Sequence, residues 1–353
     1  MDRHEIALKK LAEGTVIPAT PLVLDENRNF DEAGQRVLMN YYLNCGVGGI
    51  ATAVHTTQFE IRQPEHNLFE PILKLVSEEI DKFEKTHDTV IIKVAGVCGP
   101  TEQAVEEAKL AKKYGYDAVL LSPGGLNHLA ENEMIERTKA VADQMPVIGF
   151  YLQDAVGGRR FSYDYWEKVC AIDNVVAIKC ASFNRYTTLD VVRATAMSDR
   201  CDDITLYTGN DDNIVIDLLT KYQFDKDGKI ITKSFEGGLL GHWSVWTSKA
   251  VEYFQKIKEA KKSDYISADL LTLASQITDI NSVFFDTANG FKGCIAGLHE
   301  VLRRQGLMKN TFCLNPQETM SPGQAEEINR IYEMYPYLSD DTFVRENISH
   351  WRE

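Results

Sequence analysis

The sequence repeats one structural unit at an almost constant interval. Short runs of β-branched and apolar residues begin at positions 89, 118, 146, 175, 204 and 233, so successive starts lie 29, 28, 29, 29 and 29 residues apart. Each run is long enough for one buried strand, and the stretch after it is long enough for one helix. Two further runs, at 14–18 and 48–54, precede this series. Repeats of this length predict a chain built from βα units.

Two architectures use such units, a closed (β/α)8 barrel and an open doubly wound sheet. Even spacing over eight strands favours the barrel, and no dinucleotide-binding glycine motif follows the first run. Helix ends are recognisable between the runs. Pro100-Thr101-Glu102 begins a helix that Gly115 ends, and Ser162 caps another. We therefore predict an α/β fold, a (β/α)8 TIM barrel.

The last part of the chain lacks strand runs. Its apolar residues follow helical spacing, which predicts helices at 267–280, 292–305 and 322–334. No Gly/Ser/Pro-rich linker precedes this part. We expect residues 1–262 to form the barrel and residues 263–353 to form a C-terminal helical extension packed on it. The acidic stretch 339–341 predicts a solvated turn.

Composition narrows the class of partner. With 38 Lys+Arg against 52 Asp+Glu, the net charge is −14, which disfavours nucleic acid and anionic membranes because phosphate binding needs concentrated basic residues. No apolar stretch reaches the ~18 residues of a membrane span, and the N-terminus is charged. The seven cysteines form no CxxC pair, which argues against a zinc site or a disulfide framework. These features predict a cytoplasmic protein that binds no metal.

Two lysines interrupt apolar strand runs, Lys93 in the run at 89–96 and Lys179 in the run at 175–182. Burial lowers the pKa of a lysine, and a neutral amine attacks carbonyl carbons. Either lysine could instead be structural, held in a salt bridge or extended toward the barrel end. Their positions in apolar strand runs do not show which of the two lysines is functional.

Four motifs, taken in chain order, resemble the dihydrodipicolinate synthase/N-acetylneuraminate lyase family: Ala19-Thr20-Pro21-Leu22, His55-Thr56-Thr57, Ala177-Ile178-Lys179-Cys180-Ala181-Ser182 and Thr208-Gly209-Asn210-Asp211-Asp212. The resemblance covers the barrel, and it implies that Lys179, not Lys93, condenses with the ketone of a 2-oxo acid. A protonated imine withdraws electrons from the adjacent carbon, so a C–C bond can break or form, or water can leave. The implied activity is that of a Schiff-base lyase, aldolase or dehydratase, without a metal or other cofactor.

The resemblance also implies roles for other strand-end residues. Thr56 and Thr57 match paired threonines that would hold the substrate carboxylate, although β-branched residues are common at strand ends in any case. Tyr151 is the expected proton shuttle. Counting back from Lys179 aligns Tyr151 with the family's tyrosine, whereas counting from Pro146 aligns Phe150, which has no hydroxyl.

Glycine and tryptophan residues follow the last two strands. We expect Gly209 to leave room for the keto acid near Lys179, and Trp243 either to form a wall of the pocket or to belong to the core. The carboxylates at 211–212 argue against a phosphate-dependent barrel isomerase, since they would repel phosphate. His55 stands where the family has glycine, and it is either an acid–base group or a structural histidine.

One departure bears on the substrate. Gly124-Gly125 stands where family members that make dihydrodipicolinate have a Tyr-Tyr pair. We therefore expect a different 2-oxo acid reaction, with pyruvate or a keto sugar acid, and Arg159 or Arg160 as candidates to grip a distal carboxylate. The alternative is a barrel of the same fold that binds ligand without catalysis. The resemblance implies a homo-oligomer, a dimer or a tetramer.

Overall fold

The structure, a computed structural model, describes residues 1–352. Each of the apolar runs identified in the sequence contains a strand, and helices alternate with these strands along the chain. The chain divides into two compact units, one formed by residues 1–15 and 92–239 and the other by residues 16–91 and 240–353.

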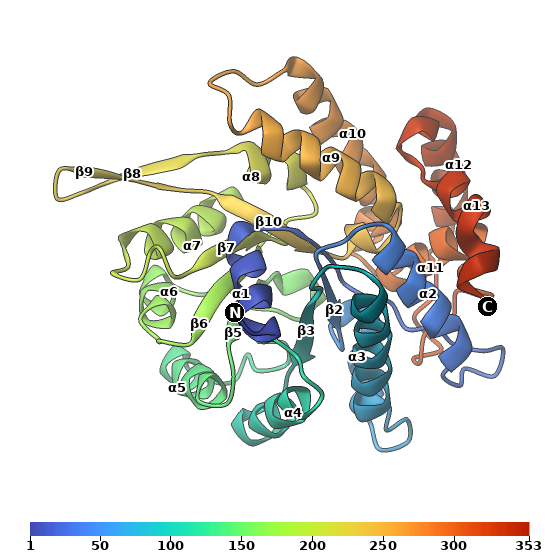
Figure 1. The fold of residues 1–353 in the computed structure, drawn as a ribbon, viewed down its shortest axis with the longest axis horizontal. Coiled ribbons are helices and arrows are strands. Elements are labelled where there is room, and N and C mark those ends of the chain that lie inside the picture. Colours follow the sequence, from blue (N-terminus) through green and yellow to red (C-terminus); the bar gives the residue numbers. More distant parts are fainter. Residues whose placement is uncertain (353) are drawn as a thin grey trace. The chain divides into compact units, whose positions relative to one another are not determined.

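Parallel strands form the centre of the first unit, in the hydrogen-bonded order β3-β4-β5-β6-β7-β10 (Figure 1). Their burial on both faces explains why the sequence runs are continuously apolar. In the register of this sheet, Phe150 lies opposite Lys179, and Lys179 lies opposite Tyr207. The strands are β3 (Ile92–Val97), β4 (Ala118–Leu121), β5 (Val147–Leu152), β6 (Val175–Ala181), β7 (Thr205–Thr208) and β10 (Phe235–Leu240), whose last residue belongs to the second unit.

The helices of the first unit begin and end at residues that favour helix termini. Helix α4 begins directly after Pro100, and Gly115 follows its end with φ 72°. The Ser162 hydroxyl accepts a hydrogen bond of 3.1 Å from Tyr165 N and caps α6 as predicted. The helices are α1 (Arg3–Glu13), α4 (Thr101–Lys113), α5 (Glu131–Ala142), α6 (Tyr163–Cys170), α7 (Arg185–Met197) and α8 (Ile214–Leu219), with a 3-10 turn η3 (Asp154–Val156).

A β-hairpin between β7 and β10 was not predicted. Its antiparallel strands, β8 (Tyr222–Lys226) and β9 (Lys229–Lys233), pack beside α7 and then extend beyond it (Figure 1). Asp227 and Gly228 form the turn with φ of 54° and 83°, the conformation that an Asp-Gly hairpin turn requires. The dipeptide was the available signal for this hairpin.

The second unit contains β1 (Val16–Pro18) and β2 (Gly49–Thr52), which run side by side, with Thr20 N donating 2.8 Å to Ala51 O just beyond them. All three predicted C-terminal helices are present, and Ser267 caps the first. The expected boundary at 262/263 falls between α9 and α10 and stays a prediction. The helices are α2 (Glu32–Asn44), α3 (Phe69–Thr86), α9 (Thr247–Ala260), α10 (Ala268–Phe284), α11 (Cys294–Arg304), α12 (Gln324–Met334) and α13 (Asp341–Trp351), with 3-10 turns η1 (His55–Thr57), η2 (Phe59–Arg62), η4 (His242–Ser244), η5 (Thr287–Asn289) and η6 (Pro336–Leu338).

The acidic stretch before α13 is not a solvated turn, so that prediction was wrong. Asp340 is buried, and its carboxylate accepts hydrogen bonds from Tyr41 Oη at 2.7 Å, Ser248 N at 3.0 Å and Gln305 Nε2 at 2.6 Å. Burial raises the pKa of Asp340 above its ordinary value. The segment therefore anchors the start of α13 within the second unit.

All seven cysteines are free thiols in the structure. Within residues 1–352, no helix combines the length and apolar character needed to cross a membrane.

Candidate active site

Lys179 is the central feature of the candidate site in the first unit. It lies on β6 with 8% of its surface exposed, and its Nζ is 4.5 Å from the centroid of the Phe150 ring. Gly209 follows β7 and lies against the stem of the lysine, where a Cβ would come within 2.5 Å of Lys179 Cε. The absence of a side chain at Gly209 therefore leaves the space that Lys179 occupies.

Burial lowers the pKa of Lys179 to about 8, because the ammonium loses hydration inside the sheet. The negative charge of Asp211, on the turn after β7, opposes this effect and stabilises the ammonium. A substantial fraction of the side chain is thus a neutral amine near pH 8. That form is the one that attacks a carbonyl carbon.

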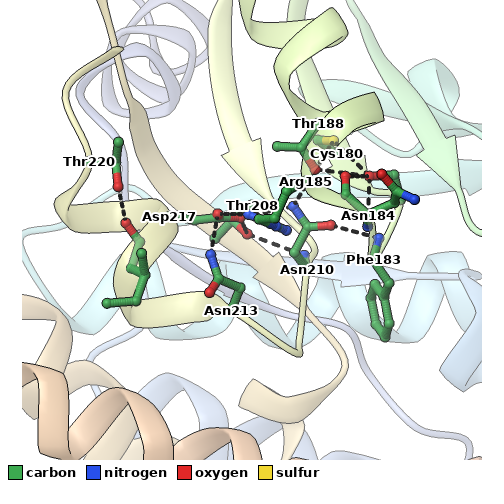
Figure 2. Close-up of polar contacts among 12 residues, drawn as sticks. Cys180, Phe183, Asn184, Arg185, Thr188, Thr208, Asn210, Asn213, Asp217 and Thr220 are labelled. Carbon is green, nitrogen blue, oxygen red and sulfur yellow. Dashed lines mark hydrogen bonds and ion pairs between the residues drawn. The ribbon is translucent and has the colours of Figure 1, made fainter.

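The turn that carries Gly209 and Asp211 is organised by a second carboxylate, Asp217 of α8 (Figure 2). Asp217 is fully buried and pairs with the Arg185 guanidinium. Its oxygens also accept hydrogen bonds from Thr208 Oγ1 at 2.8 Å, Asn210 Nδ2 at 2.8 Å and Asn213 Nδ2 at 2.9 Å. These contacts fix both ends of the turn, so Asp217 has a positioning role.

Tyr151 does not share the face of Lys179. Residues paired across parallel strands point to the same side, and the partner of Tyr151 is Cys180, whereas the partner of Lys179 is Phe150. The Tyr151 ring stacks on Trp166 with centroids 5.5 Å apart and meets the edge of Phe161 at 6.0 Å. Burial raises the pKa of its phenol. The geometry therefore does not support Tyr151 as the proton shuttle, and the alignment counted from Pro146 is the one that the register follows.

Lys93 lies on the opposite face of the sheet from Lys179. The face of Lys179 continues across the strands through the registered residues Ala177, Ile148, Leu120 and Gly96. Lys93 is three residues before Gly96, so its side chain points the other way. Its backbone N–H donates 2.9 Å to Asp117, which also binds Arg3 at 2.8 Å.

Thr56 and Thr57 belong to the second unit, in the 3-10 turn η1 after β2. Both are buried, and their hydroxyls donate to backbone carbonyls, Thr56 to Ala19 O at 2.8 Å and Thr57 to Thr20 O at 2.7 Å. The Thr57 hydroxyl also accepts a bond of 3.2 Å from Val54 N. The hydroxyl protons are therefore committed to the main chain, and the direct contribution of these side chains is to fix the shape of the turn.

The residue after the threonines connects this turn to the C-terminal part of the chain. Gln58 is buried with φ 71°, and its Oε1 accepts a hydrogen bond of 2.6 Å from Leu314 N. Arg28 holds the adjacent Cys313 carbonyl and stacks on Phe312 at 4.4 Å. The segment 312–314 is thus tied to the threonine turn within the second unit.

Trp243 belongs to the core of the second unit. Its side chain is fully buried, its indole N–H donates to the Tyr253 hydroxyl, and its ring packs on Phe254 with centroids 5.8 Å apart. Both partners belong to α9, so aromatic packing against this helix holds the tryptophan in place. His55 is half-buried beside Phe59, with ring centroids 6.1 Å apart.

The loops after β4 and β5 have local structural roles. Gly125 has φ 75°, which suits glycine, and Gly124 N donates 3.2 Å to the Ser122 hydroxyl. Arg159 donates to the carbonyls of Leu126 and Leu129, so it holds the first of these loops, while Arg160 is exposed.

The structure thus brings together Lys179, Gly209, Phe150 and Asp211, and it separates Tyr151 from them. Asp211 was not selected as a functional residue from the sequence. The available signal was an acidic residue two positions beyond a glycine at a barrel strand end. Among residues 1–352, no group of three or more His, Cys, Asp or Glu side chains is arranged to hold a metal ion.

Comparison with known proteins identifies the class. A model of the dihydrodipicolinate synthetase family matches residues 12–334, and the chain belongs to this family. N-acetylneuraminate lyase 2 of Escherichia coli O6:H1 is 23% identical over 324 residues, covering 90% of this chain and 93% of that protein. 4-hydroxy-tetrahydrodipicolinate synthase of Clostridium novyi is 28% identical over 183 residues, covering 50% of this chain and 56% of that protein. The predicted enzyme class, a lyase of the class I Schiff-base type, is confirmed at the level of the family.

Solved structures confirm the predicted (β/α)8 fold. Dihydrodipicolinate synthase from Oceanobacillus iheyensis superposes with a TM-score of 0.74 at 16% identity, covering 95% of this chain and 100% of that one. A prophage protein of the dihydrodipicolinic acid synthase family from E. coli K12, in complex with pyruvate, gives 0.72 at 15% identity, with 92% and 98% coverage.

Proposed function

We propose that Lys179 forms a Schiff base with the ketone carbon of a 2-oxo acid, which makes this chain an aldolase or dehydratase of its family. The observation that carries the proposal is the buried amine of Lys179, whose pKa is lowered to about 8 and whose stem fits against Gly209. A perturbed amine at the end of a barrel strand is the group that imine chemistry requires. A family neighbour solved in complex with pyruvate supports the 2-oxo acid as the substrate class.

The threonine turn is the proposed carboxylate anchor. Because the Thr56 and Thr57 hydroxyls donate to main-chain carbonyls, we assign them the role of shaping the turn. The main chain of the turn would then supply the donors for the carboxylate. This role follows from the family motif.

The substrate is proposed to be pyruvate or a keto sugar acid in a reaction other than dihydrodipicolinate synthesis. Gly124 and Gly125 carry no side chain where dedicated synthases have a tyrosine pair, and Gly125 has φ 75°. Condensation of pyruvate with aspartate semialdehyde should therefore be very slow. Turnover comparable to that of a dedicated synthase would contradict this assignment.

Borohydride trapping tests the Schiff base directly. The protein is incubated with pyruvate or a keto sugar acid and reduced with sodium borohydride, which converts the imine to a stable secondary amine. The expected product is one adduct per chain, with the mass of the acid minus one water plus two hydrogens. Peptide mapping should place it on Lys179.

Two variants control this experiment. Lys179→Met retains an unbranched apolar stem and should lose the adduct and at least about a thousandfold in turnover, the scale seen when a covalent nucleophile is removed. Lys93→Met, which alters the lysine on the opposite face of the sheet, should retain the adduct. An adduct on Lys93 would overturn the assignment.

A second candidate function is ligand binding without catalysis. The observation that favours it is Phe150, which places a ring without a hydroxyl beside the lysine. Binding of 2-oxo acids with no trapped adduct for any of them would support this alternative.

A further inference from the structure

We propose that the β8–β9 hairpin pairs with the same hairpin of a second copy of this chain, edge to edge along β8. The product is one four-stranded antiparallel sheet with a two-fold axis at Phe224. The inference concerns assembly, so it goes beyond the proposed function and does not depend on it. The partner is another molecule of the same protein because the exposed edge of β8 is complementary to itself.

The hairpin is a separate two-stranded sheet of the first unit, and among residues 1–352 no third strand joins it. Half-buried residues alternate with exposed ones along both strands, so one face of the ribbon packs on α7 and the other faces solvent. The ribbon continues beyond α7 without further support (Figure 1). Because an isolated two-stranded ribbon is only marginally stable in water, additional strands would stabilise it.

The turn determines which main-chain groups point out of the hairpin. It contains two residues, so the flanking pair Lys226–Lys229 exchanges both of its hydrogen bonds inside the hairpin. Such pairs alternate along the ribbon with pairs whose N–H and C=O groups point outward. On β8 the outward-pointing residues are therefore Gln223 and Asp225, and both are exposed. Within residues 1–352, no main-chain hydrogen bond joins them to another element, so this edge is open to a further strand.

The edge of β8 is complementary to itself. An antiparallel pairing that engages both outward-pointing residues sets Gln223 opposite Asp225 of the second copy, and the axis repeats this pair. Each pair exchanges two main-chain hydrogen bonds, and the glutamine amide can donate to the opposing carboxylate. Phe224 then lies opposite Phe224 of the second copy, and Tyr222 lies opposite Lys226. In this register no two like charges are directly opposite each other.

The edge of β9 lacks this complementarity. Its outward-pointing residues are Ile230 and Thr232. Pairing of β9 with itself through these residues would set Lys229 opposite Lys233 of the second copy, and the axis would repeat that pair as well. Like charges directly opposite each other on paired strands are destabilising. Lysines at both ends therefore protect β9 from self-pairing, which leaves β8 as the edge for the second copy.

Side-chain contacts hold the ribbon in one orientation. Lys226 Nζ lies 3.0 Å from Asp199, and the Lys233 ammonium donates to the Cys201 carbonyl. Both acceptors lie just after the end of α7 at residue 197, so these contacts fix both ends of the hairpin to the same segment. The edge is thereby ordered before it meets a partner, which reduces the entropy lost on association.

Sedimentation equilibrium at several protein concentrations tests the contact, because an interface this small should be reversible. Gln223→Pro removes an outward-pointing N–H and keeps the hydrogen bonds inside the hairpin, since proline is tolerated on strand edges. Particles of the unaltered protein should contain twice as many chains as those of Gln223→Pro. Thr232→Pro is the matched change at the registered residue of β9 and should assemble like the unaltered protein.

A disulfide across the axis tests the register. The two copies of Phe224 would form a pair without main-chain hydrogen bonds, whose Cα atoms lie about 4.5 Å apart, within the range that a disulfide bridges. Phe224→Cys should therefore form a covalent dimer on mild oxidation, visible on a non-reducing gel. Ile231→Cys, at the registered residue of β9, should form no more dimer than the unaltered protein with its seven native cysteines.

Each outcome supports or overturns the proposal. An unaltered protein that is monomeric at every concentration would overturn it, and so would a folded Gln223→Pro variant of unchanged particle mass. Loss of assembly in a folded Thr232→Pro variant would place the contact on β9 and would also overturn it. If Gln223→Pro does not fold, the cysteine variants decide: a dimer specific to Phe224→Cys supports the two-fold contact along β8, and its absence contradicts that contact.

Discussion

A Cβ on Gly209 would lie 2.5 Å from Cε of Lys179 and 3.1 Å from its Cγ. Both distances are shorter than ordinary van der Waals contact, so the lysine stem passes through the space that any larger residue would fill. The glycine after β7 and the lysine on β6 are therefore fitted to each other. The conformation of the proposed nucleophile depends on a residue that carries no functional group.

Gly209→Ala should displace Lys179 and slow adduct formation at least about tenfold, while the chain still folds. The displacement is expected because the added methyl group also meets Ala181 Cβ at 2.9 Å and cannot be relieved by moving a flexible chain end alone. The measurement is the trapping rate with pyruvate, with circular dichroism to confirm folding. Gly149→Ala is the control, since its Cβ would meet Ile178 Cγ1 at an ordinary 3.5 Å. Equal rates in the two variants would contradict the steric argument.

The Lys179 amine should titrate near pH 8 in a reaction that involves no substrate. Burial lowers its pKa from 10.5 to about 8, so the neutral amine is half populated there, whereas a surface lysine with a pKa of ~10.4 is neutral in only a few molecules per thousand. The rate at which a small amine-reactive acylating reagent modifies Lys179, followed by peptide mass analysis, should rise with pH and level off above about 9. Exposed Lys74 serves as the internal reference. Parallel curves for the two lysines would refute the lowered pKa.

Tyr151→Phe should leave the trapping rate within about threefold of the original. The Tyr151 ring is held between Trp166 and Phe161 on the face away from Lys179, so its hydroxyl has no route to the imine. The phenol hydrogen-bonds to the Thr187 side chain and the Phe161 backbone, so its removal should lower the free energy of unfolding by about 0.5–1.5 kcal/mol. A hundredfold loss of rate in a folded Tyr151→Phe variant would restore the proton-shuttle role expected from the sequence.

Thr57→Val should destabilise the protein by about 1–3 kcal/mol, because it leaves the Thr20 carbonyl and the Val54 N–H without their hydroxyl partner. Because β-branched residues are common at strand ends, valine would be expected to be tolerated at this position. The structure changes that expectation, since the hydroxyl is buried and makes both bonds. Chemical denaturation provides the measurement.

Thr232→Val in the hairpin is the matched control for Thr57→Val. Thr232 is exposed on β9, so valine there should change stability by no more than about 0.5 kcal/mol. If Thr57→Val is equally silent in stability but reduces kcat/KM for the 2-oxo acid, its hydroxyl acts on the substrate and not on the turn.

The fold was predictable because its signals are local. Buried parallel strands require continuous apolar runs, and helix ends require particular residues such as Ser162 and Gly115. The hairpin was missed because the regular repeat predicts a helix in this interval, whereas Asp227-Gly228 forms a hairpin turn. Asp340 was misinterpreted because an acidic residue near a chain end is usually solvated, and its partner Tyr41 lies far away in the sequence.

The site was predictable only in part. Lys179 stands out because burying an unpaired ammonium inside an apolar strand costs free energy, which points to a specific role for the lysine. The choice between Phe150 and Tyr151 depends on strand register, which a shift of one residue inverts. Sequence does not show which backbone groups or rings surround a side chain, so it could not reveal the core packing of Trp243 or the main-chain partners of the threonine hydroxyls.

The hydrogen bond between Gln58 and Leu314 bears on how members of this family can be recombined. In a chimera that joins residues 1–262 of this chain to the tail of a relative, a different segment would replace residues 312–314. Gln58 and Arg28 would then lose the main-chain groups that they bind here. The tail is therefore not an interchangeable part, since Gln58 and Arg28 must be inherited together with residues 312–314. A tail-swapped chimera should fold stably only when these positions are transplanted as a set.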